Sequence, residues 1–138
     1  MRLGKDAKVE LIKNVPLFSR LSKNALQEVA SIADEIDFPA GKVLTQQGAR
    51  GREFLVILEG AAEVEQNGER VNTLGNGDFF GEIALITKLP RTATVTATAP
   101  LRALVITDRD FLTLLRRSPE VGEGVVAALG ERLAPELS

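Results

Sequence analysis

Two charged residues, Glu82 and Arg91, stand in a stretch that glycines open and apolar residues surround. Glycines occur at positions 75, 77 and 81, Glu82 follows the last of them, and Arg91 comes nine residues later, directly after Pro90. A guanidinium can bind an anion through bidentate, charge-assisted hydrogen bonds. A carboxylate only accepts hydrogen bonds, so it suits a pair of hydroxyl groups better than an anion. An anion beside sugar hydroxyl groups describes a nucleotide.

The backbone around these charges has properties that suit close contact with a ligand. Gly81 tolerates a positive φ and has no side chain, so a ligand can approach its backbone closely. Residues 82–86 are long enough for about one and a half helical turns, and the first amides of a short helix can receive an anion. Taken singly, the two charges could instead form a weak surface ion pair, and the glycines could be ordinary turn residues.

The order of residues from 80 to 93 resembles the phosphate-binding cassette of cyclic nucleotide-binding domains. The resemblance is carried by Phe80-Gly81-Glu82-Ile83-Ala84-Leu85 and, after a short spacer, by Pro90-Arg91-Thr92-Ala93. It extends more loosely over residues 15–133. Domains of this family occur in the catabolite activator protein, in cyclic-nucleotide-dependent kinases and in cyclic-nucleotide-gated channels.

The resemblance implies a role for each residue of the cassette. Glu82 would accept a hydrogen bond from the ribose 2′-hydroxyl, and Arg91 would pair with the cyclic phosphate. The remaining positions would supply backbone groups and contacts near phosphate, ribose and purine: Gly81, Ile83, Ala84, Thr92 and Ala93.

Composition narrows the classes of protein to consider. The chain has 138 residues, of which 44% are hydrophobic and 26% charged, which is typical of a soluble globular domain. The net charge of −2 does not favour a nucleic-acid interface. Cysteine and histidine are both missing, so thiolate chemistry, the common zinc sites and the commonest general base are excluded. The residues show neither a membrane span nor a secretory signal, so we expect a cytoplasmic protein.

The middle of the chain alternates strand-like runs with tight turns. Residues 54–58 form an apolar run suited to a strand buried on both faces, and Asn67-Gly68 is a hairpin signal. Strands are expected at residues 35–38, 43–46, 54–58, 61–65, 70–74, 91–98 and 101–107. Seven or eight short strands predict a closed antiparallel structure. We expect a mainly β fold with flanking helices, namely a double-stranded β-helix or jelly-roll-like β-roll.

Helices are expected at both ends of the chain. The first two cover residues 6–14 and 23–33, with Ser22 as the N-cap of the second. Asp108 is the expected N-cap of a helix over 109–117, Ser118-Pro119 marks a break, and a final helix covers 121–133. We therefore expect one cyclic nucleotide-binding domain over residues 1–138. Its parts are N-terminal helices at 6–33, the β-roll at 34–107 with the cassette at 80–93, and C-terminal helices at 108–134.

The resemblance implies that residues 108–119 form a hinge and that the last helix closes over the bound base as a lid. Val126, Leu129 and Leu133 are the lid candidates, with core packing as the alternative for each. Three glycines weaken this helix by about 1 kcal/mol each relative to alanine, which suits a segment that becomes ordered on binding.

The expected function is that of a regulatory sensor without catalytic activity, which binds a cyclic nucleotide and moves its C-terminal helices. The composition looks bacterial and favours cAMP over cGMP, although Thr92 could also bind a guanine amino group. Alternatives are the sensor part of a cAMP-responsive transcription regulator or of a larger cAMP-regulated enzyme, and a degenerate scaffold that binds no nucleotide. An enzyme of the cupin kind is disfavoured because cupins place histidines on the barrel to hold a metal.

The partners follow from the expected function. We expect the cyclic nucleotide as ligand, an attached or separate output domain, and no cofactor or metal. Contacts with nucleic acid or a membrane are not expected for this domain. The final helix could pair with its counterpart in a homodimer.

Overall fold

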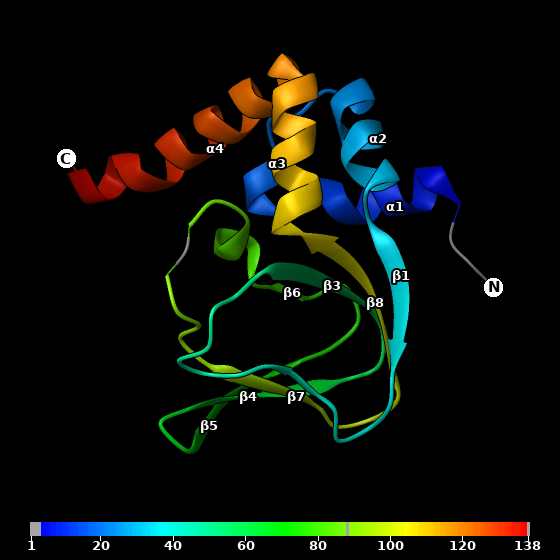
Figure 1. Ribbon diagram of the computed structural model, residues 1–138, viewed down its shortest axis with the longest axis vertical. Coiled ribbons are helices and arrows are strands. Elements are labelled where there is room, and N and C mark those ends of the chain that lie inside the picture. The colour runs from blue at the N-terminus through cyan, green and yellow to red at the C-terminus, as the bar shows by residue number, and fades with distance from the viewer. Residues whose placement is uncertain (1–3, 88, 138) are drawn as a thin grey trace. The chain divides into compact units, whose positions relative to one another are not determined.

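The chain folds as two units, one built from its middle and one from its two ends. The computed structural model describes residues 4–87 and 89–137, and for Ile83 and residues 131–137 it describes the backbone only. Residues 34–108 form the β unit. The helical unit contains the segments on either side, up to Ala33 and from Arg109 onward. Figure 1 shows the strands and helices of the two units.

The β unit contains two antiparallel sheets of four strands each within the described residues. One sheet has the strand order β1-β8-β3-β6 and the other β2-β7-β4-β5. The strands are β1 (Asp34–Phe38), β2 (Val43–Thr45), β3 (Glu53–Glu59), β4 (Ala62–Gln66), β5 (Glu69–Leu74), β6 (Phe79–Phe80), β7 (Thr94–Ala97) and β8 (Leu101–Thr107). This arrangement confirms the predicted mainly β fold with flanking helices.

The core of the β unit lies between the two sheets. In β3, the side chains from Phe54 to Ile57 are all buried, as the apolar run predicts. β3 pairs with β8 in an antiparallel register that sets Leu55 opposite Val105. Buried side chains from both sheets form one cluster: Leu55, Ile57, Ala62, Val95, Ala97, Leu101, Ala103 and Val105. Burial of this apolar surface is the main force that holds the sheets together.

The hairpin between β4 and β5 turns at Asn67-Gly68, as predicted. Asn67 has φ 54° and Gly68 has φ 82°, and two consecutive residues with positive φ are the signature of a type I′ turn. The side chain of Gln47 binds the turn twice: Nε2 donates to Asn67 Oδ1 at 2.9 Å, and Oε1 accepts from the Asn67 amide at 2.8 Å. The loop before β3 is therefore fastened to the tip of this hairpin.

Several predicted boundaries differ from the structure. The two-residue strand β6 was not predicted; it includes Phe80, the first residue of the predicted cassette, and it pairs with β3 by placing Phe80 opposite Leu55. The strand predicted over residues 91–98 is formed only from Thr94 to Ala97. Its first residues pair elsewhere, because the Arg91 amide donates to the Ala49 carbonyl and the Arg91 carbonyl accepts from Gly48, both at 2.8 Å.

The helical unit brings the two ends of the chain together. Its elements are α1 (Lys5–Lys13), the 3₁₀ helix η1 (Pro16–Phe18), α2 (Lys23–Ser31), α3 (Asp108–Arg117) and α4 (Pro119–Leu137). Phe18 and Phe111 are fully buried, and their rings meet edge to face with centroids 5.8 Å apart. Asp108 is the first residue of α3, not its cap. α4 begins two residues earlier than predicted because Pro119 fits the first turn of a helix, and it continues to Leu137.

One polar contact connects α2 to the beginning of α4. The Ser22 hydroxyl oxygen accepts a hydrogen bond from the Ala25 amide at 3.2 Å, which confirms Ser22 as the N-cap of α2. The same hydroxyl donates to the Glu120 carboxylate. A single side chain thus caps one helix and holds the first turn of another.

We predict that Ser22→Ala lowers the free energy of unfolding by about 1 kcal/mol, because the variant loses an N-cap. Urea unfolding followed by far-ultraviolet circular dichroism measures this change. Ser31→Ala is the matched control, since the Ser31 hydroxyl donates only to the Glu28 carbonyl on the exposed face of α2. The prediction is wrong if both variants unfold at the same urea concentration as the parent protein.

Candidate functional site

A cavity of about 500 Å³ opens in the β unit beside the cassette. Its walls combine apolar side chains of both sheets with a small number of polar and charged groups. It is lined by Thr45, Val64, Gln66, Leu74, Phe79, Phe80, Gly81, Glu82, Ala84, Thr87, Leu89, Pro90, Arg91, Thr92, Ala93 and Val95. Six of the seven residues predicted for the site line this cavity; the seventh, Ile83, has a side chain outside the described part of the chain.

The cassette begins with a turn at Gly81 and continues as a short 3₁₀ helix. Gly81 has φ 83°, the left-handed conformation that glycine adopts most readily. The helix η2 covers Glu82–Leu85, so the one-and-a-half-turn helix predicted over residues 82–86 is shorter and of a different type. The Ala84 amide donates to the Gly81 carbonyl at 3.0 Å, which is the tighter bonding pattern of a 3₁₀ turn. An anion at this amide would have to share it with that carbonyl.

Glu82 brings a carboxylate to the cavity wall while most of its surface is covered. It is 8% exposed, and the neighbouring Ala84 and Leu85 are buried as well. Among the described residues, no buried side-chain nitrogen or oxygen atom lacks a hydrogen-bond partner. The carboxylate is therefore an acceptor in an environment of low exposure. Such a group has high specificity for donors because leaving it unmatched is costly.

Arg91 brings a cation to the same cavity. Its backbone is fixed on both sides by the two hydrogen bonds to Ala49 and Gly48, and a β-bridge pairs the adjacent Pro90 with Arg50. Its guanidinium donates to the backbone carbonyl of Glu53. Burial lowers the pKa of this guanidinium below its ordinary value, and the Glu53 carboxylate opposes that shift. Since arginine stays protonated in proteins, the cavity presents a partly desolvated positive charge.

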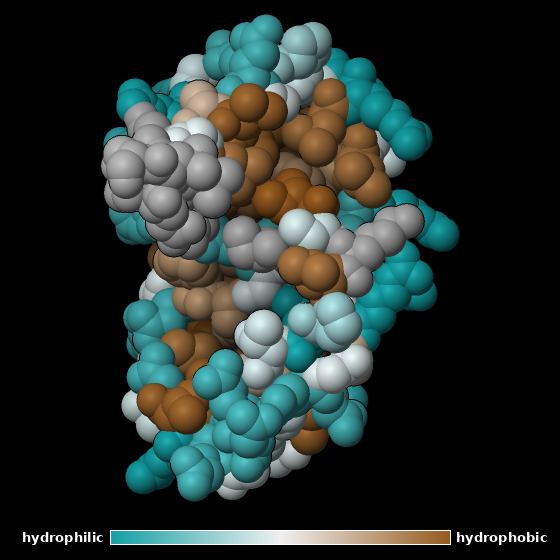
Figure 2. Space-filling model, turned by 90° about the vertical axis from the view of Figure 1, so that its left-hand side faces the viewer, coloured by the Kyte–Doolittle hydropathy of each residue, from teal (hydrophilic) through white to brown (hydrophobic). Residues whose placement is uncertain are grey.

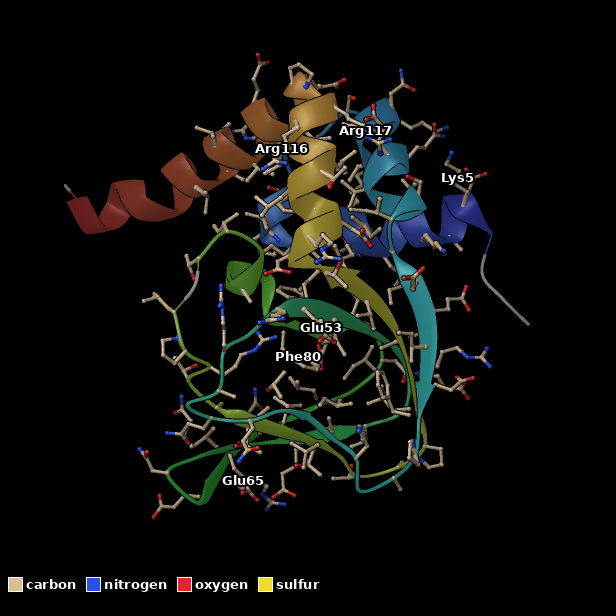
Figure 3. All side chains as sticks on the ribbon, viewed as in Figure 1. Lys5, Glu53, Glu65, Phe80, Arg116 and Arg117 are labelled. Atoms are coloured by element: carbon tan, nitrogen blue, oxygen red, sulfur yellow. The ribbon has the colours of Figure 1, made fainter. Side chains whose placement is uncertain are left out.

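Glu53 and Phe80 come from paired strands beside the cavity. Phe80 lies opposite Leu55 of β3, two residues beyond Glu53, and both residues are labelled in the β unit in Figure 3. Phe80 lines the cavity and packs against the core cluster. The carbonyl that binds the arginine thus belongs to a strand whose position is set by buried neighbours.

The residues after Arg91 are held by side-chain amides and hydroxyls of neighbouring strands. Gln66 Nε2 donates to the Thr92 carbonyl at 3.2 Å, and Thr45 Oγ1 donates to the Ala93 carbonyl at 3.4 Å. The Thr92 side chain is exposed and lines the cavity. It is available to a ligand while its backbone is fixed.

The predicted lid residues all lie on α4, in the helical unit. Val126 is 69% exposed and Leu129 is partly buried, whereas the side chain of Leu133 lies outside the described residues. The space-filling view shows hydrophobic side chains on the surface of the helical unit (Figure 2). Core packing is therefore not the role of Val126, and its role as part of a lid stays a prediction.

Two of the residues that sequence analysis missed contribute no side chain to the site. Glu53 contributes a carbonyl, which no side-chain pattern reveals, and Gly51 contributes the space occupied by Arg91. Gln66 and Leu74 also line the cavity. Leu74 could have been found by working out which strands pair. It lies on β5, and β5 and the strand that carries Val95 both lie next to β4 in one sheet.

Two other kinds of site were sought in the described part of the chain. It contains no helix long and apolar enough to cross a membrane. It also contains no group of three or more histidine, cysteine, aspartate or glutamate residues arranged to hold a metal ion.

A β-roll whose cavity is lined by both an acid and an arginine is the architecture of a small-molecule-binding domain. Comparison with known proteins identifies the family of this domain. The family model described as the cyclic nucleotide-binding domain matches residues 35–118. This chain therefore belongs to the cyclic nucleotide-binding domain family, whose fold is that of a regulatory or sensor domain.

Similar proteins include kinase subunits, channels and transcription regulators. The chain is 38% identical over 136 residues to a cAMP-dependent protein kinase regulatory subunit of Mycosarcoma maydis, covering 92% of this chain and 24% of that protein. It is 37% identical over 123 residues to a cyclic nucleotide-gated potassium channel of Rhizobium etli, covering 89% and 34%. The chain thus spans about a quarter to a third of the length of these relatives.

Among solved structures, the N-terminal domain of a transcriptional regulator from Streptomyces coelicolor is similar over most of its length. The TM-score is 0.83 with 26% sequence identity, and the match covers 91% of this chain and 94% of that one. The two chains therefore share the arrangement of strands and helices described above.

Proposed function

We propose that this domain binds cAMP in the cavity of its β unit and passes the binding event to its C-terminal helices. The observation that carries the proposal is that Glu82 and Arg91, predicted from their spacing, line one cavity. The cavity volume of about 500 Å³ lies within the range of roughly 300–1,000 Å³ that is usual for small-molecule sites.

The chemistry of the two charges assigns the parts of the ligand. Arg91 pairs with the cyclic phosphate, because a partly buried guanidinium is the strongest anion partner in the cavity. Glu82 accepts from the ribose 2′-hydroxyl. The backbone of Gly81, Ile83 and Ala84 lies along the phosphate and ribose. Thr92 and Ala93 complete the site beside the arginine.

Fewer specific contacts support the choice of cAMP over cGMP than support the binding of the phosphate. The kinase relative named above is a cAMP-dependent regulatory subunit, and this supports cAMP. Apolar residues supply much of the remaining wall, among them Val64, Leu74 and Val95. They offer shape complementarity to either purine and few hydrogen bonds, so we expect modest discrimination between the two nucleotides.

The output of the domain is a movement of its C-terminal helices. A ligand shifts an equilibrium only through different affinities for two states. When phosphate binds Arg91 and the cassette, the segment from Asp108 to Pro119 repacks and α4 closes as a lid, with Val126, Leu129 and Leu133 as its contacts. An output domain, attached or separate, responds to the position of α4. A second copy of the chain responds in the same way if α4 pairs in a homodimer. The relatives, which are much longer than this chain, support an attached output.

We predict that the chain binds cAMP, and that it binds cGMP more weakly. Arg91→Ala should weaken cAMP binding by about 30-fold to several thousand-fold, because the phosphate charge of the ligand is then left without its partner. Arg91→Lys recovers little, because lysine lacks the planar pair of donors. Isothermal titration calorimetry measures both nucleotides.

Arg70→Ala is the matched control, because Arg70 lies on the same unit with its side chain 66% exposed and only a 3.9 Å ion pair to Glu63. The control should bind cAMP within a factor of two of the parent. Absence of heat with both nucleotides at millimolar concentration, or parental affinity in Arg91→Ala, contradicts the proposed function.

A second prediction concerns the ribose. Glu82→Ala should lose most of the preference for cAMP over 2′-deoxy-cAMP, because the partner of the 2′-hydroxyl is gone, whereas Glu82→Gln keeps one acceptor oxygen and part of the preference. Competition titration with the two nucleotides measures the ratio. Glu69→Ala, an exposed change in β5, should keep the parental ratio; an unchanged ratio in Glu82→Ala would show that the ribose lies elsewhere.

A third prediction concerns the lid. Amide hydrogen exchange in the C-terminal half of α4 should slow when cAMP is added, because closure removes open states of a glycine-containing helix. Amides of β3 and β8, which are already buried, serve as the internal reference. Slower exchange in the cassette with no change in α4 would separate ligand binding from lid closure and refute the coupling.

A further inference from the structure

A second glycine, Gly51, also lies against the Arg91 side chain. Gly51 is buried, and a Cβ atom added to it would lie 2.7 Å from the Arg91 Cζ atom and 2.8 Å from Cδ. Ordinary van der Waals contact begins at 3.4 Å. A methyl group at this position and the present arginine side chain therefore cannot occupy their places together.

Gly81 lies against the same guanidinium for different reasons. A Cβ atom there would contact Arg91 Nη1 and would also lie 2.7 Å from the Glu53 carbonyl oxygen. Its φ of 83° is in addition unfavourable for residues with a side chain. Gly51 has neither problem: its φ is outside the left-handed region, and the three nearest atoms to its added Cβ all belong to Arg91.

The backbone of Arg91 cannot move to relieve a contact at Gly51. Its amide and carbonyl are bonded to Ala49 and Gly48, only two and three residues before Gly51. Gly51 and Arg91 therefore lie on two segments that these backbone hydrogen bonds hold together. A side chain at position 51 must therefore move the arginine side chain itself by more than half an ångström, which changes the geometry of its hydrogen bond to the Glu53 carbonyl.

We propose that Gly51 is a positioning residue of the site, and that its missing side chain is what lets the Arg91 guanidinium lie between residues 51 and 81 and donate to the Glu53 carbonyl. Its effect on affinity rests on the proposed function. Its effect on the placement of Arg91 can be measured on the protein alone.

The placement is tested by a double-mutant cycle without ligand. Gly51→Ala should lower the thermal unfolding midpoint by a few degrees when Arg91 is present, and should leave it unchanged in an Arg91→Ala background, because alanine at position 91 removes the three atoms that lie nearest to the added Cβ. Gly81→Ala should lower the midpoint in both backgrounds. Gly75→Ala is the control, since a Cβ there has nothing within 4 Å and an ordinary φ; it should lower the midpoint in neither.

The effect on the site is tested by calorimetry with cAMP on the same variants. Gly51→Ala should weaken binding by roughly tenfold or more, because a displaced guanidinium loses its aligned, charge-assisted hydrogen bonds. In the Arg91→Ala background the same change should alter the dissociation constant by less than a factor of two. An additive loss of stability in the cycle overturns the proposal, and so does parental cAMP affinity in Gly51→Ala. If the parent chain binds neither cAMP nor cGMP, the proposed function fails while the stability cycle still decides the role of Gly51.

Discussion

The Arg91 cation is held at a partly buried wall by backbone groups on three sides. Ala49 and Gly48 fix its main chain, and the Glu53 carbonyl accepts from its guanidinium. Desolvating a charge is costly unless partners replace water. The surrounding glycines supply the space in which those partners can come close. The loop before β3, the cassette and the start of β7 are therefore arranged about one side chain.

The rest of the β unit gives this arrangement its rigidity. Glu53 opens β3, whose next four side chains are all buried and whose residues pair with β8. The two-residue strand β6 joins the same sheet and delivers Gly81 beside Glu53. The Glu53 carbonyl lies on a well-packed strand and is a fixed acceptor, so it orients the Arg91 guanidinium before a ligand binds. Such preorganisation limits the entropy that binding must cost.

Much of the site could be predicted because its chemistry resides in side chains with a distinctive order. Glu82 and Arg91 are charges of opposite sign at a distinctive spacing in a largely apolar stretch, and Gly81 marks a backbone with positive φ. Glu53 could not be predicted, since every residue has a backbone carbonyl, and Gly51 could not be told from an ordinary loop glycine, since the sequence does not show that it lies against Arg91. The fold followed from strand periodicity, but β6 is too short for a period to show.

The type of the helix in the cassette could not be predicted from the sequence either. Whether residues 82–85 form an α or a 3₁₀ turn depends on which carbonyls accept from their amides, and the Ala84 amide donates to Gly81, three residues earlier. Likewise the strand predicted from residue 91 begins at Thr94 because the loop at residues 48–49 takes the hydrogen bonds of Arg91. Local patterns do not specify such choices between nearby partners.

The bond between Gln47 and the Asn67 turn has a practical consequence for engineering. Hairpin tips are usually convenient places to insert a fluorescent reporter, because little depends on them. Here Gln47 joins the tip to the loop that fixes Arg91, and Gln66, at the end of β4, holds the Thr92 carbonyl. A reporter inserted at this tip is therefore expected to disturb the placement of Arg91, and its emission is expected to change when the contacts of Arg91 change.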